Sequence, residues 1–499
     1  MNRPPAAQRT DLVRIAIETM RERGLAPEFP QAAVQQAAAL DGDGAAPSDE
    51  RDAAIADLRA LPWCSIDNDD SRDLDQLTVC EALAGGVVKL FVAVADVDAL
   101  VDQGTPIDAH AAHNTTSVYT AARIFPMLPE RLSTDLSSLN PARDRLALVT
   151  QIVIAADAGI TQATVYRARV RNHAKLAYDA VAAWIDGAGA LPAAAAAVPG
   201  LDAQLRTQDA LAQRQRARRH AEGSLEFETF QPRAVYDGER VVEIRQQVQN
   251  RARQLIEEFM IATNQVNARF LGDSGSASLR RVVRSPERWQ RIVELAAKVG
   301  DALPAQADSR ALEAFLVRRR QADPLRFPDL SLAVVKLMGS GEYVVAQPGV
   351  EPVGHFGLAL RDYTHSTAPN RRFPDLITSR LLKAALTRRA APYSVAELTD
   401  LAAHCSQQEN AAQKVERKLR KCEAALLLQS RLGQRFDAIV TGHTKSDTWV
   451  RTFTPPVEGR LDTPAPGLDV GERVRVELVA TDVERGYIDF VLASGAAAR

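Results

Sequence analysis

The segment SIDNDDSRDLDQ, residues 65–76, decides the reading of this 499-residue chain, because it places five aspartates within nine positions. Magnesium prefers oxygen ligands such as carboxylates. A pair of such ions can activate water and stabilise the leaving oxygen of a phosphodiester. In an extended segment Asp73 and Asp75 share a face, and a turn through residues 68–71 would bring Asp67 back toward them. The segment predicts a hard-cation site, with a solvated acidic loop as the alternative.

Strand patterns follow the acidic segment and predict the core of an α+β domain. Residues 77–82 and 87–97 flank Gly85-Gly86 and predict a hairpin whose second, almost fully apolar strand is buried on both faces. The alanine-rich stretch 187–200, with two prolines, predicts an inserted loop. Further strands are predicted at 146–155 and 161–170, and helices at 251–270, 286–299, 374–386 and 395–432.

The two ends of the chain predict further units. Residues 11–23, 31–40 and 48–61 predict three short helices, which suit either a helix-turn-helix or a plain helical cap. Four short strands near the C-terminus, at 436–441, 447–452, 474–482 and 487–493, have the length expected of a small OB-type barrel. We therefore expect a multidomain α+β protein with a helical module (1–60), a mixed α/β domain (61–432) that contains the acidic segment, and an all-β OB barrel (433–499).

The composition excludes several classes of protein. Hydrophobic residues make up 46% and charged residues 25%, which is the balance of a globular chain. The formal net charge of −2 argues against a uniformly basic coat but leaves room for a local basic channel. The four cysteines form no Cys-x-x-Cys pair, so we expect neither disulfides nor structural zinc. Without a long apolar run, a secretory signal or a Walker-type loop, we expect a cytoplasmic monomer with no membrane contact and no nucleotide cofactor.

Three further sequence blocks follow the acidic segment. The first is NTTSVY (114–119) with RIFPMLPERLS (123–133), and the second is RQLIEEFMIATN (253–264). The third is HFGL (355–358) followed by YTHSTAPNRRFPDL (363–376). With the acidic segment, these blocks resemble the signature of the ribonuclease II (RNB) family over residues 63–432. The terminal barrel resembles the RNA-binding OB domain of the ribosomal S-one type that the family carries there.

The resemblance implies a hydrolytic, processive 3′→5′ exoribonuclease. Such an enzyme releases nucleoside 5′-monophosphates from single-stranded RNA with magnesium or manganese. Matching motif positions implies that Asp67, Asp73 and Asp75 belong to the metal and catalytic cluster. It also implies that Arg371 binds the scissile phosphate, a role that suits a planar guanidinium able to bind phosphate oxygens in pairs. Asp75 and Arg371 are therefore the expected catalytic residues.

The resemblance also implies four residues that contact RNA. Tyr119 matches an aromatic on which the 3′-terminal base stacks, with a core tyrosine as the alternative. Tyr178 and Glu257 match positions that recognise ribose, with plain packing as the alternative. Glu416 matches a glutamate near the terminal nucleotide, and its alternative is a helix-surface ion pair with Arg420.

The sequence departs from the family pattern in two places. Gln76 stands where the acidic block usually has a second consecutive aspartate, and an amide oxygen can ligate magnesium but adds no charge. One metal contact is therefore in doubt, with Asp69 or Asp70 as substitutes. The family also commonly opens with cold-shock OB domains, for which the first 62 residues lack the strand pattern, so RNA entry would be guarded by the helical module.

Clustered cations and terminal aromatics complete the expectation of an RNA channel. Residues 214–220 and 414–421 are dense in Arg and Lys, with solvated helix faces as the alternative. The barrel mixes Phe436, His443, Trp449 and Phe453 with Lys445 and Arg451, as single-strand binders do. Gln76 also motivates a different hypothesis, a non-catalytic RNA-binding protein that retains the scaffold. A third hypothesis is a nucleic-acid-binding regulator that uses the helical module.

Overall fold

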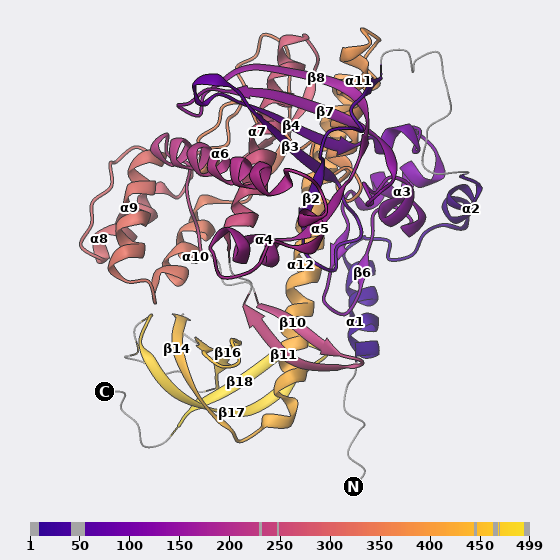
Figure 1. Ribbon diagram of the computed structural model, residues 1–499. Coiled ribbons are helices and arrows are strands. Elements are labelled where there is room, and N and C mark those ends of the chain that lie inside the picture. Colours follow the sequence, from indigo (N-terminus) through magenta and orange to yellow (C-terminus); the bar gives the residue numbers. More distant parts are fainter. Residues whose placement is uncertain are drawn as a thin grey trace.

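The centre of the computed structural model is a seven-stranded sheet in the order β1-β8-β7-β4-β3-β2-β9 (Figure 1). The structure describes residues 9–40, 55–228, 232–246, 249–443, 447–462, 468 and 470–493. The central pairs are antiparallel, whereas β1 and β9 pair in parallel with β8 and β2. The strands are β1 (Ala56–Asp57), β2 (Cys64–Asp67), β3 (Gln76–Ala82), β4 (Val88–Ala95), β7 (Asp144–Ile154), β8 (Ile160–Arg171) and β9 (Ala174–Ala177).

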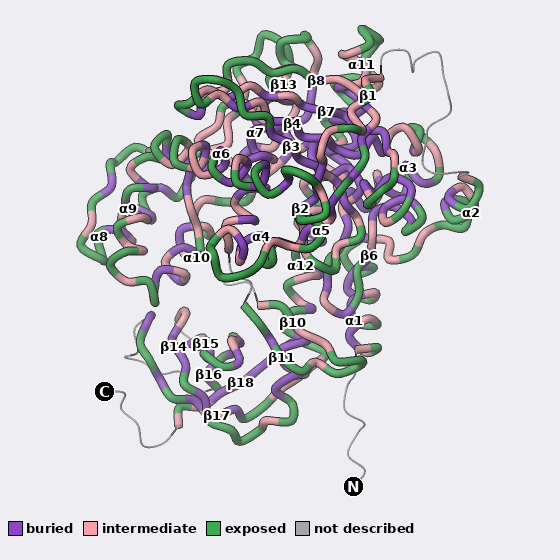
Figure 2. Tube along the Cα trace, viewed as in Figure 1, coloured by how far each residue is buried: buried purple, intermediate pink, exposed green. Residues whose placement is uncertain are grey.

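The predicted hairpin and the two long strands after it are confirmed. β3 and β4 pair from Gln76↔Val94 to Ala82↔Val88, and every residue of β4 except Lys89 is buried. β4 is buried on both sides because helices cover the two faces of the sheet, and Figure 2 shows its central strands as buried. Phe91 and Ala93 pack toward α11 (Phe373–Leu386), whereas Leu90 and Val92 pack toward α6 (Leu201–Ala221) and α7 (Arg251–Asp273).

Two of the three predicted N-terminal helices form, namely α1 (Arg9–Glu22) and α2 (Gln31–Ala39). The predicted helix 48–61 is wrong in its described part, because Ala56–Asp57 is a strand that pairs with β8. Residues 41–54 lie outside the described residues. α1 lies along α12 (Val395–Leu428), whereas α2 contacts α3 (Pro106–Asn114), so each helix joins the body through its own contacts.

The alanine-rich stretch is not simply an inserted loop. It contains α5 (Ala193–Ala196), and Ala195 is buried in the same core as Leu201 of α6. Small alanine side chains allow this short helix to approach its neighbours closely. Several helices had no counterpart in the prediction, namely α4 (Tyr178–Ile185), α6, α9 (Ser309–Ala322) and α10 (Phe327–Met338).

The predicted long helices are confirmed with small shifts of their ends. α7, α8 (Trp289–Lys298), α11 and α12 cover the predicted segments. α12 begins with a capping box, in which Ser394 and Glu397 each bind the other's backbone N–H. α8, α9 and α10 form a separate helical lobe with a core of their own, built from Trp289, Ile292, Phe315, Leu316 and Phe327.

The C-terminal region is a closed barrel in the order β14-β15-β16-β18-β17, which confirms the predicted small barrel. The prediction missed β16, a four-residue strand. Gly459 in β16 is required by close packing, because a Cβ there would lie 2.5 Å from the Phe490 ring. Arg451 ties the barrel to the helical lobe through an ion pair of 2.8 Å with Asp329 of α10. The strands are β14 (Arg435–His443), β15 (Thr448–Thr452), β16 (Glu458–Leu461), β17 (Arg473–Asp482) and β18 (Tyr487–Leu492).

Three short strand pairs are described outside the seven-stranded sheet and the barrel. β5 (Val118–Tyr119) pairs with β6 (Ile124–Phe125), and β10 (Pro232–Asp237) pairs with β11 (Arg240–Gln246). A third pair joins β12 (Ser278–Val282) to β13 (Glu342–Ala346). Across the described ranges, no helix combines the length and the apolar character needed to cross a bilayer.

Candidate active site

The acidic segment connects two neighbouring strands at one edge of the central sheet. β2 ends at Asp67, whose Oδ1 accepts a hydrogen bond of 2.7 Å from the Asn68 backbone N–H. The chain turns and returns through Asp73 and Asp75 to β3, and the Ala95 N–H donates to the Asp75 carbonyl at 3.0 Å. This last bond extends the β3–β4 pairing by one residue. The sheet therefore holds the three predicted carboxylates in one short connection.

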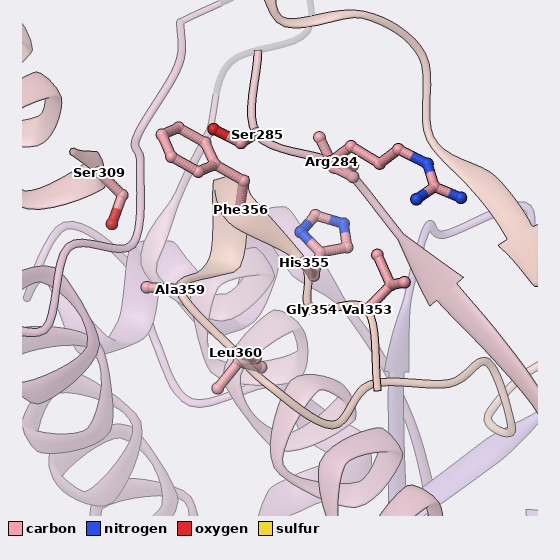
Figure 3. Close-up of a pocket in the computed structure, with 10 residues that line it drawn as sticks. Arg284, Ser285, Ser309, Val353, Gly354, His355, Phe356, Ala359 and Leu360 are labelled. Carbon is pink, nitrogen blue, oxygen red and sulfur yellow. The ribbon is translucent and has the colours of Figure 1, made fainter. Parts of the chain in front are cut away.

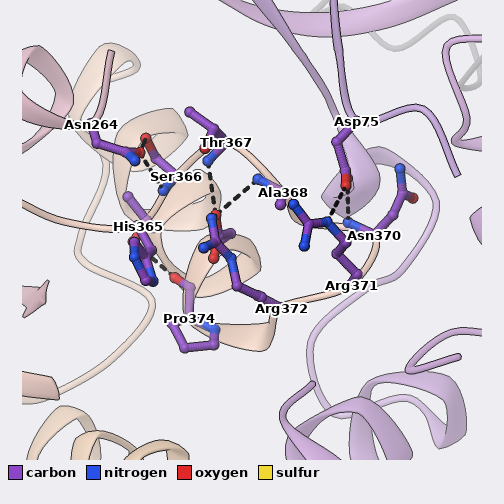
Figure 4. Close-up of polar contacts among 12 residues, drawn as sticks. Asp75, Asn264, His365, Ser366, Thr367, Ala368, Asn370, Arg371, Arg372 and Pro374 are labelled. Carbon is purple, nitrogen blue, oxygen red and sulfur yellow. Dashed lines mark hydrogen bonds and ion pairs between the residues drawn. The ribbon is translucent and has the colours of Figure 1, made fainter. Parts of the chain in front are cut away.

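A loop before α11 binds the Asp75 side chain (Figure 4). The Asn370 N–H donates to Asp75 Oδ1 at 2.9 Å, and Arg371 Nε donates to Oδ2 at 3.2 Å. Asp75 is only 2% exposed, whereas the Arg371 side chain is 43% exposed. Arg371 therefore holds a buried carboxylate with one nitrogen and presents the rest of its guanidinium to solvent. The two predicted catalytic residues are in direct contact.

Buried polar residues fix the shape of this loop. Asp375 of α11 is fully buried, and its Oδ1 accepts from the N–H groups of Thr367 (2.8 Å) and Ala368 (2.9 Å) and from Arg372 Nη2 (2.7 Å). On the other side, the N–H and hydroxyl of Ser366 donate to Asn264 Oδ1 of α7 at 2.9 and 2.8 Å. Sequence reasoning assigned no role to Asp375 or Asn264, although both lie in the quoted blocks. A polar residue at a buried helical position is the signal that could have revealed them.

Tyr119 joins two other predicted residues. Its hydroxyl donates to Asp73 Oδ2 at 2.7 Å, and its backbone N–H donates to Glu416 Oε1 of α12 at 3.0 Å. Tyr119 keeps 36% of its surface exposed, yet burial raises the pKa of its hydroxyl. Glu416 forms no ion pair with Arg420 among the described contacts, so the contact with Tyr119 is the one that orients it.

Tyr178 lies on the other side of the acidic segment, at the first turn of α4. The Arg253 guanidinium stacks 4.4 Å from the centre of its ring, and Arg253 Nη2 donates to Asn68 Oδ1 at 2.9 Å. These three residues line a cavity of about 450 Å³, which β10 and β11 close from the opposite side with Arg233 and Arg245. The acidic segment thus borders a recess lined by both arginines and aspartates. Sequence reasoning had missed Asn68 and Arg253.

Gln76 and Glu257 have different surroundings. Gln76 begins β3 and, by strand alternation, shares a face with Thr78, whose hydroxyl donates to Gln208 of α6 at 2.8 Å. Its side chain therefore points away from that of Asp75. Glu257 accepts a hydrogen bond of 3.2 Å from the Gln249 side chain, and no described contact joins it to the acidic segment. The structure does not bring these two residues to the carboxylates.

The charge balance at the carboxylates suits a cation. Burial raises the pKa of Asp75 to about 7, the Arg371 charge lowers it, and the neighbouring Asp73 charge raises it. Burial also raises the pKa of Asp67. Negative charge therefore exceeds positive charge in a poorly hydrated place, and the donors are all hard oxygens. The donor set of Asp67, Asp73 and Asp75 fits a divalent ion such as magnesium.

Another cluster satisfies metal-ligand spacing but is occupied by arginines. Among the described residues, the ligand atoms of His220, Glu226 and Glu313 all lie within 4.8 Å of one another, and the three aspartates do not form such a group. Glu226 already binds Arg216, and Arg320 Nη1 lies 2.9 Å from its Oε1. Two guanidinium charges would repel a metal ion at this position. This trio is part of a structural ion network.

Several arginines of the basic segment 214–220 form ion pairs within the protein, and its place in an RNA channel stays a prediction. Arg218 pairs with Asp157 and Glu222, and Arg219 pairs with the buried Glu258 of α7. The pairs with Asp157 and Glu258 bind α6 to neighbouring elements, whereas the pair with Glu222 lies at the end of α6 itself. In the second basic segment, Lys414, Arg417 and Lys421 are exposed on α12. Exposed cations that a polyanion could reach therefore lie on α12.

A second cavity, of about 480 Å³, lies against the HFGL block (Figure 3). It is lined by His355, Phe356 and Arg284, and shares no residue with the acidic segment. His355 Nδ1 accepts a hydrogen bond of 3.1 Å from the Leu358 N–H. Burial lowers the pKa of His355 to about 4, so its imidazole is neutral at pH 7. His355 stabilises the turn of its own block.

Two family models match separate parts of the chain. A model described as RNB domain matches residues 55–388, and one described as RNase II-type exonuclease C-terminal S1 domain matches residues 434–493. Ribonuclease R of Escherichia coli (strain K12) is 31% identical over 504 residues, which cover 93% of this chain and 60% of that protein. Ribonuclease R of Vibrio cholerae is 29% identical over 96% of this chain and 61% of its own length. The chain thus spans about 60% of the length of these curated relatives.

Solved structures share the fold. RNase R of Mycoplasma genitalium, in complex with ribose methylated single-stranded RNA, has a TM-score of 0.87 at 23% identity and covers 97% of this chain and 78% of its own. Yeast Ssd1, described as a pseudonuclease, has a TM-score of 0.69 at 17% identity and covers 90% and 55%. At such identities the likeness shows the fold alone. Because a pseudonuclease has this fold as well, activity must be argued from the site.

Proposed function

The chain belongs to the RNB family, as its ordered blocks predict, and we propose that it is a hydrolytic 3′→5′ exoribonuclease. It would degrade single-stranded RNA processively and release nucleoside 5′-monophosphates. One observation carries the proposal: the buried Asp75 carboxylate is bound by Asn370 N–H and by Arg371, whose guanidinium remains 43% exposed. A buried acid and an accessible cation meet where both a metal ion and a phosphate can bind.

Ribonucleases of this family depend on divalent metal ions in general, and we propose magnesium here, with manganese as a substitute. Asp67, Asp73 and Asp75 would hold the ion, and a metal contact of Gln76 stays a prediction. When bound, the metal supplies an activated water and stabilises the leaving oxygen. The excess of carboxylates over cations at Asp67, Asp73 and Asp75, with burial raising the pKa of Asp75 and Asp67, supports this assignment.

The chain's own residues bind and orient the RNA end. The guanidinium of Arg371 has N–H groups left for phosphate oxygens, and it stays charged at any relevant pH. The exposed ring of Tyr119 offers a stacking surface for a terminal base. Asp73 and Glu416 hold this ring from its two ends, through the hydroxyl and the backbone N–H.

Contacts further along the RNA follow from the charged and aromatic surfaces. Tyr178 with the stacked Arg253 suits a nucleotide beside the acidic segment. In the barrel, Phe453 is 37% exposed, and the Arg473 guanidinium lies 5.6 Å from its ring centre. Roles of Tyr178 and Glu257 in ribose recognition stay predictions. Location in the cytoplasm and a monomeric state also stay predictions.

The second candidate is a non-catalytic RNA-binding protein with the same scaffold. Gln76 favours it, because one expected carboxylate is missing beside the cluster. The two candidates differ in one respect: only the first needs Asp75 to be ionised and bound to a cation.

The test uses 5′-labelled single-stranded RNA, incubated with the full chain in magnesium, in manganese or in chelator. Products are resolved at single-nucleotide steps, and released nucleotides are identified by chromatography. We expect shortening from the 3′ end with 5′-monophosphate release in metal and none in chelator. RNA that binds but is not shortened with either metal would establish the second candidate instead.

A further inference from the structure

The hairpin that carries Tyr119 is held from behind by a buried glutamate. Glu423 lies on α12 two turns beyond Glu416, and it is 2% exposed. Tyr236 of β10 donates its hydroxyl to Glu423 Oε1 at 3.1 Å. Burial raises the pKa of Glu423, whereas hydrogen bonding to Tyr236 and to the backbone of Ala122 and Ala121, at the tip of the hairpin, lowers it. One carboxyl therefore joins α12, β10 and the hairpin.

An arginine of α1 holds the same tip from another direction. Arg9 Nε donates to the Ala122 carbonyl at 2.8 Å, and its guanidinium lies 5.0 Å from the centre of the Tyr236 ring. The Arg9 N–H also donates to the Glu239 carbonyl at 3.0 Å, beside β10. Apolar side chains fill the space between these polar contacts: Leu12, Ile15, Ala16 and Met20 of α1 share a core with Val118, Ala122, Phe125, Val415 and Leu419.

The opposite face of the hairpin is open. Tyr119 and Ile124 are direct cross-strand partners, so their side chains lie on one face, and they are 36% and 51% exposed. β5 and β6 have two residues each, and a pair this short has little stability of its own. The position of the Tyr119 ring therefore depends on what holds the hairpin from behind.

We propose that Glu423 and Arg9 are positioning residues that fix the Tyr119 hairpin against α12 and thereby set the length at which RNA shortening stops. The inference rests on the proposed function. A long RNA has many phosphate contacts, whereas a short product has few and depends on the stack at its terminal base. Loosening the hairpin therefore affects the last steps of degradation more than the first.

Two variants remove the support, and two matched variants retain it. Arg9→Ala and Glu423→Leu each delete one contact to the hairpin tip. Arg14→Ala is the control on α1, because Arg14 pairs with Glu18 and Glu484 and none of its described contacts is to the hairpin. Glu423→Gln is the conservative control, because an amide oxygen can still accept from Tyr236 and the backbone.

The first measurement is hydrogen exchange of the backbone amides in residues 118–125, which does not require activity. We expect exchange at least threefold faster in Arg9→Ala and Glu423→Leu, and wild-type exchange in the two controls. Unchanged exchange in both support variants would overturn the proposal. Faster exchange in both Arg9→Ala and Glu423→Leu could not be explained by a folding defect confined to Glu423→Leu.

The second measurement compares final products and initial rates on a long 5′-labelled RNA. We expect end products shifted by at least one nucleotide in the support variants, with initial rates within threefold of wild type. An unchanged end-product length, or an equal shift in Arg14→Ala, would overturn the proposal.

The third measurement separates this proposal from the proposed function. RNA with a 3′-terminal 2-aminopurine is bound in chelator, where stacking on Tyr119 quenches its fluorescence. We expect the quench to fall at least twofold in the two support variants and to stay at the wild-type level in the controls. If the wild-type chain shortens no RNA, the proposed function is contradicted, and the positioning of the hairpin is still tested by the fluorescence. An equal quench in all variants would contradict the positioning proposal.

Discussion

Asp75→Asn tests the centre of the site, because it removes one charge and keeps the shape of the side chain. Asp75 is 2% exposed, and burial raises the pKa of its carboxyl to about 7 from an ordinary 3.8. At pH 8 the folded protein therefore carries an ionised group at a cost of about 4 kcal/mol relative to the unfolded chain. Asparagine can still accept the Asn370 N–H, but it offers Arg371 no charge.

The variant should lose activity and gain stability. We expect hydrolysis to fall about 10³-fold, equivalent to about 4 kcal/mol of transition-state stabilisation. RNA affinity should stay within a few fold, because most of it comes from phosphate contacts elsewhere. The free energy of unfolding at pH 8 should rise by up to about 4 kcal/mol, less a small loss because the half-exposed Arg371 gives up its partner.

The pH dependence has a defined sign. A carboxyl with a raised folded pKa contributes stability that is complete below the unfolded pKa near 4 and is lost as the pH rises through about 7. Wild type suffers this loss and the asparagine variant does not. Their difference in unfolding free energy should be widest above pH 7 and should shrink to less than half at pH 5.

Urea unfolding in chelator at pH 5 and pH 8 measures stability, and single-nucleotide gels in magnesium measure hydrolysis. Asp273→Asn, an exposed aspartate at the end of α7, is the matched control and should change neither. Two results would refute the reasoning: hydrolysis within tenfold of wild type, or a variant that is less stable than wild type at pH 8.

Three further predictions concern other residues of the site. Arg371→Lys should lower activity tenfold or more with an unchanged unfolding free energy, because lysine has no paired N–H groups for phosphate; equal activity in gel assays would make Arg371 structural. Tyr119→Ala should change the end-product length more than the initial rate on long RNA, because one stacked base is worth about 1–3 kcal/mol; unchanged products would contradict this. Burial raises the pKa of Glu423 to about 7, so Glu423→Gln should be more stable than wild type by up to about 3 kcal/mol at pH 8 and about equal near pH 4. Urea unfolding checks this last difference, and a gain independent of pH would disprove it.

Much of the fold was predictable because it is written in local patterns. The hairpin of β3 and β4 follows from alternating and continuous apolar runs on either side of Gly85-Gly86, and the long helices follow from their periodicity. The structure brings Asp73, Tyr119 and Glu416 into contact, and likewise Asp75 and Arg371, whereas the roles that the ordered motifs imply stay predictions. Residue type alone indicates that the site binds a metal ion and a phosphate, since hard cations prefer carboxylates and phosphates are bound well by guanidinium groups.

Local sequence patterns predicted secondary structure less well where the burial of a segment depends on residues far away in the chain. The alanine-rich stretch lacks periodicity, so its short helix and the buried Ala195 could not be foreseen. β16 is too short to show alternation. The strand at Ala56–Asp57 forms because β8, more than a hundred residues later, offers an open edge.

Tertiary structure alone decided which charges remain available. Arg219 forms an ion pair with Glu258, 39 residues away. The Asp375 carboxylate accepts hydrogen bonds from the loop that carries Arg371. Which face of β3 holds Gln76 depends on where α6 packs. α1 meets the Tyr119 hairpin through Arg9 and Ala122, 113 residues apart. The sequence by itself determined the kind of chemistry, because that depends on residue types in order; only the tertiary structure decided which side chains face one another, because that depends on contacts between segments far apart in the chain.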